Sequence, residues 1–127
     1  MIINKILLLD DDPIVNIINE QLFRKFNACN QYIICRTSQE AIDYLNSSSS
    51  LPEILIIDLN IPIIKGFDFL DKFYARFINS ISVYVLTSSV NPTDKSKSLS
   101  YPFVKGYLKK PITKDVILSI IAENCHE

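Results

Sequence analysis

Short aliphatic runs that end at charged or polar residues constrain the fold of this chain more than any other feature. Five such runs occur along the 127 residues, and a longer stretch with helical spacing of apolar residues follows each of them. Most of the runs are apolar throughout, which is typical of strands buried on both faces of a parallel sheet. The predicted strands are Lys5–Leu9, Tyr32–Cys35, Ile54–Ile57, Ile81–Leu86 and Val104–Leu108.

Helical patterns lie between the predicted strands, and two of them begin with the same signal. Asp12-Pro13 and Asn91-Pro92 each place a capping side chain before a proline, which has no N–H to leave unpaired in the first turn. The other predicted helices begin at Ser38, at Gly66 and after Thr113. The first helix is predicted to bury one apolar face, formed by Ile14, Ile17, Ile18, Leu22 and Phe26.

The alternation of five strands with five helices predicts an α/β fold in which helices cover both faces of a parallel sheet. Right-handed crossovers then make the sheet doubly wound. A length of 127 residues is typical of one domain, so we expect a single domain over residues 1–127 with no output domain. In folds of this kind the chemistry lies at the carboxyl ends of the strands.

Composition argues against several classes of function. The 13 basic and 14 acidic residues give a net charge of -1, which argues against direct binding of nucleic acid. Two glycines, Gly66 and Gly106, are too few and too far apart for a glycine-rich phosphate loop. Aliphatic runs of about four residues are far shorter than the ~20 of a membrane span. The odd number of cysteines, three, disfavours a disulfide framework, so we expect a cytoplasmic protein without membrane insertion.

The residues at the carboxyl ends of the predicted strands combine acidic, hydroxyl and ammonium groups. Asp10 and Asp11 follow the first strand, Asp58 the third, Thr87 the fourth and Lys110 the fifth. If the first and third strands are neighbours, three carboxylates meet, and charges ~4 Å apart repel by about 4 kcal/mol at an effective dielectric constant of ~20. A hard cation such as Mg²⁺ relieves this repulsion, and the metal, lysine and hydroxyl together suit a phosphoryl group.

Four motifs in this order resemble those of a response-regulator receiver domain, the phosphoacceptor of two-component signalling. They are LLLDDDP (7–13), IIDLNIPIIKG (56–66), VLTSS (85–89) and GYLKKP (106–111), and the resemblance runs from about Asn4 to Glu123. It implies a flavodoxin-like sheet with strand order 2-1-3-4-5. The acidic residue common before the loop glycine of this family is replaced by Lys65, which leaves partner choice and phosphate lifetime open.

The resemblance also implies a role for each site residue. Asp58 is the expected phosphoacceptor, and Lys110 pairs with the phosphoryl group, oriented by a cis peptide bond to Pro111. Thr87 and Tyr107 are the expected switch residues. The expected Mg²⁺ ligands are Asp10, Asp11, Asp58 and the backbone carbonyl of Asn60.

The function implied by the resemblance is transfer of a phosphoryl group to Asp58 from a sensor histidine kinase or a phosphotransfer protein. The added charge shifts the conformation of the face formed by the fourth helix, fifth strand and fifth helix, which then acts on an unidentified downstream protein. Transfer is self-assisted and the phosphate is lost by autodephosphorylation, so we do not class the protein as an enzyme.

Two other functions remain open from the sequence. The spacing Asp10-x-Asp12 also resembles the opening motif of aspartate-nucleophile phosphohydrolases, with Asp10 as nucleophile and Asp12 as acid. The phosphohydrolase interpretation leaves Asp58 without a role. It also needs a later acidic motif for metal binding, which does not follow the fourth predicted strand. The second alternative is an interaction module that has kept the fold but lost phosphorylation.

Overall fold

The computed structural model describes residues 3–27, 29–77 and 81–124, the side chains of residues 73–77 excepted, and in this part strands and helices alternate strictly. The strands are β1 (Ile3–Leu9), β2 (Cys29–Cys35), β3 (Ile54–Ile57), β4 (Ser82–Thr87) and β5 (Val104–Lys109). The helices are α1 (Pro13–Lys25), α2 (Ser38–Ser47), α3 (Gly66–Phe77), α4 (Pro92–Ser100) and α5 (Lys114–Asn124). All neighbouring strands pair in parallel in the order β2-β1-β3-β4-β5, which confirms the predicted doubly wound sheet.

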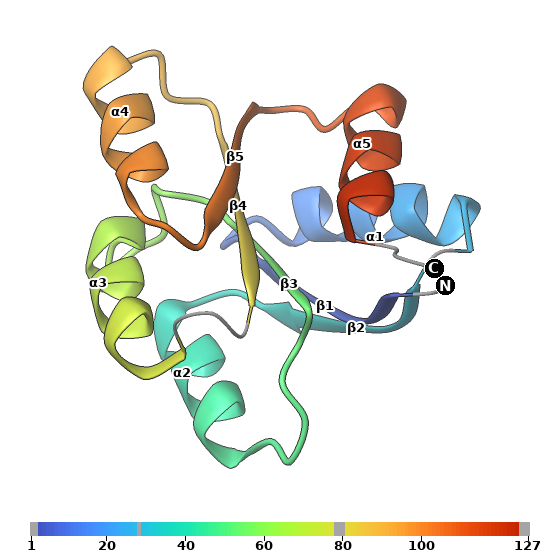
Figure 1. Cartoon of the computed structure of the whole chain (residues 1–127), viewed down its shortest axis with the longest axis horizontal. Helices are drawn as coiled ribbons and strands as arrows, with labels where there is room; N and C mark the ends of the chain where they lie inside the picture. Colours follow the sequence, from blue (N-terminus) through green and yellow to red (C-terminus); the bar gives the residue numbers. More distant parts are fainter. Residues whose placement is uncertain (1–2, 28, 78–80, 125–127) are drawn as a thin grey trace.

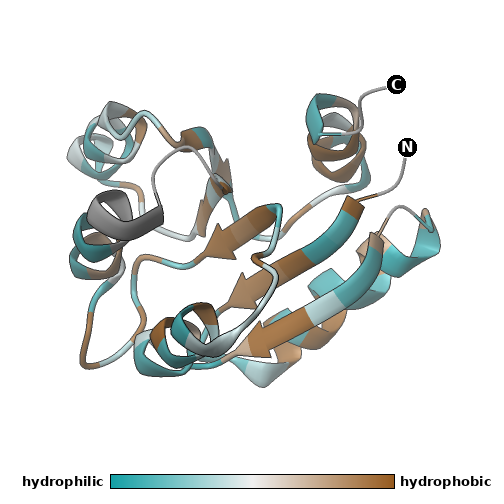
Figure 2. Cartoon of the chain, turned by 60° about the horizontal axis from the view of Figure 1, so that its bottom comes forward, coloured by the Kyte–Doolittle hydropathy of each residue, from teal (hydrophilic) through white to brown (hydrophobic). Residues whose placement is uncertain are grey.

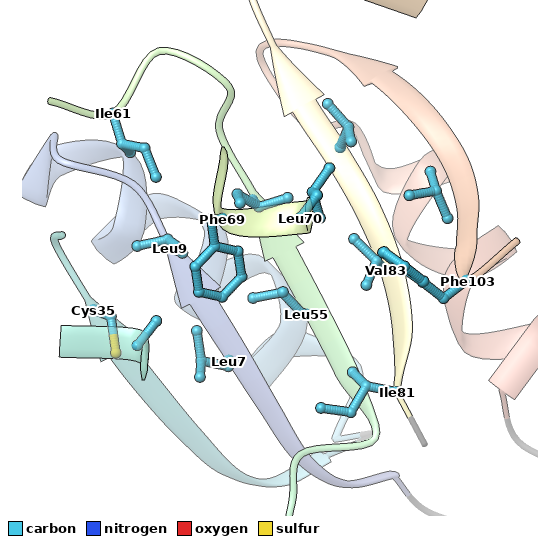
Figure 3. Packing of buried hydrophobic residues seen from close by; sticks show 14 of the residues in the cluster. Leu7, Leu9, Cys35, Leu55, Ile61, Phe69, Leu70, Ile81, Val83 and Phe103 are labelled. Carbon is cyan, nitrogen blue, oxygen red and sulfur yellow. The ribbon is translucent and has the colours of Figure 1, made fainter. Parts of the chain in front are cut away.

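Helices lie on both faces of the sheet (Figure 1), and two apolar layers hold them against it. Helices α1 and α5 cover one face, where Phe23, Ile117 and Ile120 pack on side chains of the central strands. Helices α2 and α3 cover the other face, where Phe69 and Leu70 are buried. Figure 2 shows that the strands are predominantly hydrophobic, and Figure 3 shows side chains from strands, helix and loops meeting in the α2/α3 layer. Each large apolar side chain buried in this way contributes about 1.5–3 kcal/mol to stability.

The predicted helix starts are confirmed by their caps. Asp12 accepts a hydrogen bond from the Ile14 amide through its side chain, and Asn91 does the same for Thr93. Each cap satisfies one amide at the start of the helix that has no intrahelical partner. The following proline has no N–H, so it fixes the helix start without leaving a further amide unpaired.

The predicted apolar face of α1 is wrong. Ile14, Ile17 and Ile18 are 60%, 52% and 47% exposed, whereas Asn16 and Asn19 are buried. The helix is rotated so that Asn16 reaches the end of β1, where its side-chain amide donates to the Asp10 carbonyl at 2.8 Å. The side of α1 that faces the sheet therefore carries Asn16, Asn19 and the fully buried Phe23. Of the predicted face, Leu22 and Phe26 pack partly against the core.

Strand boundaries differ slightly from the prediction. β2 begins at Cys29 rather than Tyr32, because pairing with β1 starts at Ile3 and carries polar residues into the edge strand. β1 begins at Ile3 rather than Lys5, and β4 begins at Ser82 rather than Ile81. β4 and β5 each end one residue later than predicted, since Thr87 and Lys109 still pair with each other. Cys29 and Cys35 are free thiols, and Cys125 lies outside the described residues. None of the helices in the described part of the chain is long and apolar enough to cross a membrane.

Gly66 is expected to be essential for packing of the loop after β3. A Cβ atom there would lie 2.7 Å from the Leu59 Cα and 3.2 Å from the Asp58 carbonyl oxygen, both backbone atoms. Gly66→Ala should therefore lower the free energy of unfolding by about 1–3 kcal/mol, although alanine favours helix by about 1 kcal/mol. Urea unfolding measures this difference.

Gly106→Ala is the matched comparison for this test. Its Cβ would first meet the Tyr84 ring, at 3.0 Å, and a side chain yields more readily than backbone. We expect a smaller loss of stability than at Gly66. A Gly66→Ala protein as stable as the wild type would contradict the packing argument.

Candidate functional site

Strand pairing brings two acidic residues to the same edge of the sheet. Leu9 of β1 is paired with Ile57 of β3, and the Asp58 amide donates to the Leu9 carbonyl at 3.0 Å. Asp10 and Asp58, the next residues along each strand, therefore leave the sheet side by side. The separation of 48 positions in sequence is closed by the register of two central strands.

Asp10, Asp11 and Asp58 form an acidic cluster. One carboxylate oxygen from each lies within 4.8 Å of the others, and Asp10 and Asp58 are buried whereas Asp11 is exposed. Three carboxylates held this closely suit a hard divalent cation, and an exposed member leaves room for retained water. The donor set of this chain therefore fits Mg²⁺.

Lys110 lies between the two buried carboxylates of the acidic cluster. Its Nζ is 2.7 Å from Asp10 Oδ2 and 2.9 Å from Asp58 Oδ2. Its backbone amide donates to the Thr87 carbonyl at 3.0 Å, which ties it to the end of β4. The peptide bond between Lys110 and Pro111 is cis, as the sequence resemblance predicted.

Burial and charge act in opposite directions on the buried acid and the lysine. Burial raises the pKa of Asp10 above its usual 3.8, and the charge of Asp58 adds to this, although bonds from Lys110 and the Asp12 amide oppose it. Burial lowers the pKa of Lys110, but contacts with Asp10 and Asp58 outweigh it and raise the pKa above 10.5. The lysine therefore stays protonated, and it is the ammonium that holds the two carboxylates together.

Backbone amides fix the orientation of both buried carboxylates. The Asp12 amide donates to Asp10 Oδ1 at 2.9 Å, and the Asn60 amide donates to Asp58 Oδ1 at 3.1 Å. In each case the donor lies two residues after the acceptor, the local turn that aspartate favours. The other oxygen of each carboxylate faces Lys110.

Thr87 ends β4 beside this cluster and connects it to α4. Thr87 is completely buried, and its hydroxyl oxygen accepts from the Ser89 amide at 3.2 Å. The Ser89 hydroxyl in turn donates to Asp94 Oδ2 at 2.5 Å, in the first turn of α4. Movement of the Thr87 side chain is thus linked through two hydrogen bonds to a helix.

Tyr107 lies on β5 rather than in the acidic cluster. It pairs with Val85 in the sheet, so its side chain is on the same face as that of Thr87, two residues further along β4. The Tyr107 hydroxyl oxygen is buried and has no hydrogen-bond partner among the described residues. A buried hydroxyl without a partner is costly, so a new hydrogen bond to it would be favourable.

Polar contacts rather than apolar burial hold α4 in place. Ser98 is its only buried residue in the structure as described. Lys97 lies over the Phe67 ring of α3 at 4.4 Å, and the Tyr101 hydroxyl donates to Asp71 Oδ1 at 2.6 Å. Because these contacts are few and near the surface, α4 is the helix that can shift at the lowest free-energy cost.

Two residues that support the site escaped the sequence analysis. Asn16 holds the Asp10 carbonyl, and the Arg36 guanidinium donates to the Asp11 carbonyl at 3.3–3.4 Å. For Asn16 the sequence offered one signal, because it is a polar residue in the middle of an aliphatic helical pattern, six positions after Asp10. Arg36 directly follows β2, so its place at the carboxyl end of a strand was visible, but it was assigned no role.

Asp10→Asn is expected to raise the free energy of unfolding at neutral pH. The pKa of Asp10 is higher in the folded protein than its usual 3.8, so its ionisation destabilises the fold as the pH rises through the folded-state value. The gain should shrink as the pH falls through that value and vanish well below 3.8. Urea unfolding in metal-free buffer at several pH values measures it.

Asp12→Asn is the control for this substitution. Asp12 is exposed, and asparagine caps a helix as well as aspartate, so its effect on the free energy of unfolding should be small. If Asp10→Asn were less stable than the wild type at neutral pH, or its gain did not change with pH, burial of an ionised Asp10 would not be the dominant effect.

Comparison with known proteins agrees with this geometry. Residues 6–122 match the family model for the response regulator receiver domain. A two-component response regulator from Cytophaga hutchinsonii is 30% identical, with a TM-score of 0.87 and coverage of 97% of this chain and 99% of that chain. The bacteriophytochrome response regulator RtBRR is 27% identical with a TM-score of 0.82, covering 100% of this chain and 80% of that chain.

Among curated proteins, the transcriptional regulatory protein CitT of Halalkalibacterium halodurans is 27% identical over 113 residues, which is 89% of this chain and 48% of that protein. The C4-dicarboxylate response regulator DctR of the same organism, named as probable, is 25% identical and is covered over 46% of its length. The chain thus spans about half the length of these two relatives. Fold, site geometry and family match agree, and the chain belongs to the response regulator receiver domain family.

Proposed function

We propose that Asp58 accepts a phosphoryl group from a histidine kinase or phosphotransfer protein in a Mg²⁺-dependent phosphorelay. The observation that carries this proposal is the position of Lys110, whose ammonium contacts the carboxylates of Asp10 and Asp58 at 2.7 and 2.9 Å. Asp58 is buried and directly follows β3, within the motif 56–66 for which the resemblance implies the phosphoacceptor.

The metal would be held by carboxylate oxygens of Asp10, Asp11 and Asp58 and by the Asn60 carbonyl. When bound, Mg²⁺ neutralises charge on phosphoryl oxygens. The chain's own residues supply the remaining requirements. The backbone amides of Asp12 and Asn60 orient the buried carboxylates, and Lys110 provides a second positive charge beside Asp58.

The reaction is a displacement at phosphorus. A carboxylate oxygen of Asp58 forms the new O–P bond while the N–P bond of the donor phosphohistidine breaks, and the imidazole leaves with the bonding electron pair. Lys110 stays protonated and pairs with the oxygens of the transferred phosphoryl group. Its ammonium therefore faces negative charge both before and after the transfer. Later attack by water at phosphorus restores the Asp58 carboxylate and releases inorganic phosphate, so the protein is a phosphoacceptor rather than a conventional enzyme.

Signalling follows from the new charge at Asp58. Phosphorylation adds about -1.5 to -2 charge and three acceptor oxygens. The Thr87 hydroxyl already accepts from the Ser89 amide, and its own proton is available to donate to a phosphoryl oxygen. Because Ser89 is bonded to Asp94, such a move changes the position of α4, and Tyr107 on β5 follows. The face formed by α4, β5 and α5 would then bind a downstream protein. A cytoplasmic location is part of this proposal.

Phosphorylation should occur at Asp58 and depend on Lys110. Incubation with Mg²⁺ and a small acyl phosphate should add one phosphoryl group, which borohydride reduction and peptide mass spectrometry locate at residue 58. Lys110→Ala should slow the reaction by about 10²-fold, because it removes a charge that acts on the transferred group. Lys109→Ala, at the adjacent exposed lysine, should react at the wild-type rate.

The same experiment decides between the proposal and its alternatives. A label on Asp10 would support a phosphohydrolase that uses Asp10 as nucleophile. Absence of label, together with no joint binding of Mg²⁺ and beryllofluoride, would support an interaction module. Asp58→Asn should abolish labelling under all conditions.

Activation should change the structure along the path from Thr87 to Tyr107. With Mg²⁺ and beryllofluoride, which stands in for the phosphoryl group, backbone amide NMR signals of residues 87–107 should shift. Asp58→Asn should show none of these shifts. Changes confined to the loops that carry Asp10 and Asp58 would contradict a conformational signal through α4.

A further inference from the structure

Asn16 is a buried polar residue whose hydrogen-bonding capacity is only half used. It is 2% exposed, and its side-chain amide donates to the Asp10 carbonyl at 2.8 Å. Its carbonyl oxygen, Oδ1, has no partner among the described residues. The amide cannot be turned around to correct this, because the Asp10 carbonyl only accepts and needs the NH₂ group. A buried acceptor left in this state costs about 1–3 kcal/mol.

A small cavity lies beside Asn16, on the α1 side of the sheet and behind the acidic cluster. Its volume is about 10 Å³, at the lower limit of the space that one water molecule occupies. Polar groups form one part of its wall and apolar side chains of the central strands form the rest. The lining residues are Leu8, Leu9, Asp10, Asn16, Asn19, Ile56, Asp58 and Leu86.

We propose that this cavity binds one ordered water molecule, which links α1 to the back of the acidic cluster. A water there donates to Asn16 Oδ1 and to a carboxylate oxygen of Asp10 or Asp58, and the Asn19 side chain offers a third polar partner. Two to four such partners are what buried waters in proteins have. The site explains why two asparagines, rather than the neighbouring isoleucines, face the sheet.

Asn16 is then a positioning residue for the acidic cluster. One end of its amide holds the Asp10 backbone carbonyl, and the other end holds the water, which bonds to a carboxylate of Asp10 or Asp58. This second part of the inference rests on the proposed function, because it concerns the affinity of the cluster for Mg²⁺. The water site itself does not.

The water is tested on the full chain without metal or phosphate donor. In ¹⁵N-labelled protein the Asn16 side-chain amide should show a direct cross-peak to a long-lived water. No lining residue carries a hydroxyl that could relay this signal. Oxygen-17 relaxation dispersion should count one long-lived water fewer in Asn16→Leu and in Asn19→Leu, while Gln21→Leu, on the exposed side of α1, should match the wild type. No cross-peak and equal counts would overturn the proposal.

Mg²⁺ titration then separates positioning from a purely structural role. Asn16→Leu removes the bond to Asp10 and the water together, and Mg²⁺ should bind about tenfold more weakly. Asn19→Leu leaves the bond from Asn16 to Asp10 in place, so it should lower the Mg²⁺ affinity by less. It also replaces Asn16→Leu in the titration if that variant fails to fold. Unchanged Mg²⁺ affinity in folded variants would overturn the positioning role. A wild type that does not bind Mg²⁺ would contradict the proposed function, while the water count would still decide on the cavity.

Discussion

The pairing of β1 with β3 is the constraint on which the rest of this structure depends. It places Asp10 and Asp58 next to each other at one edge of the sheet, where the burial of both is unfavourable by itself. Lys110, from the end of β5, makes the arrangement possible by contacting both carboxylates. One ammonium therefore bridges the two buried carboxylates and offsets part of their negative charge.

Different kinds of contact hold different helices of this molecule. The helices α1, α2, α3 and α5 are held against the sheet by two apolar layers, packed as densely as protein interiors are. By contrast, α4 is held by hydrogen bonds from Ser89 and Tyr101 and by the contact of Lys97 with Phe67. A change of charge close to α4 can therefore rearrange its polar contacts without disturbing the two apolar layers.

The helix α1 shows where sequence patterns fail. Its isoleucines have the spacing of a buried face, and counting apolar residues led to the wrong side of the helix. The buried side of α1 instead carries Phe23, which packs in the core, and Asn16, which bonds to the backbone at the end of β1. The contact of Asn16 is visible only once both elements are placed. Asn19 turns inward with it. A polar residue that interrupts an aliphatic helical pattern close to an acidic strand end is the signal that was available.

What the sequence alone determined was the order of strands and helices, the helix starts at Asp12 and Asn91, and the residues at the strand ends. These follow from local chemistry, because apolar runs, caps and prolines act within a few residues of each other. The tertiary structure alone decided that Asp10, Asp11 and Asp58 meet within 4.8 Å, that Lys110 bridges two of them, and that asparagines of α1 lie behind them. Distances between residues far apart in sequence depend on strand register and helix rotation, and only the packing of the whole chain fixes both.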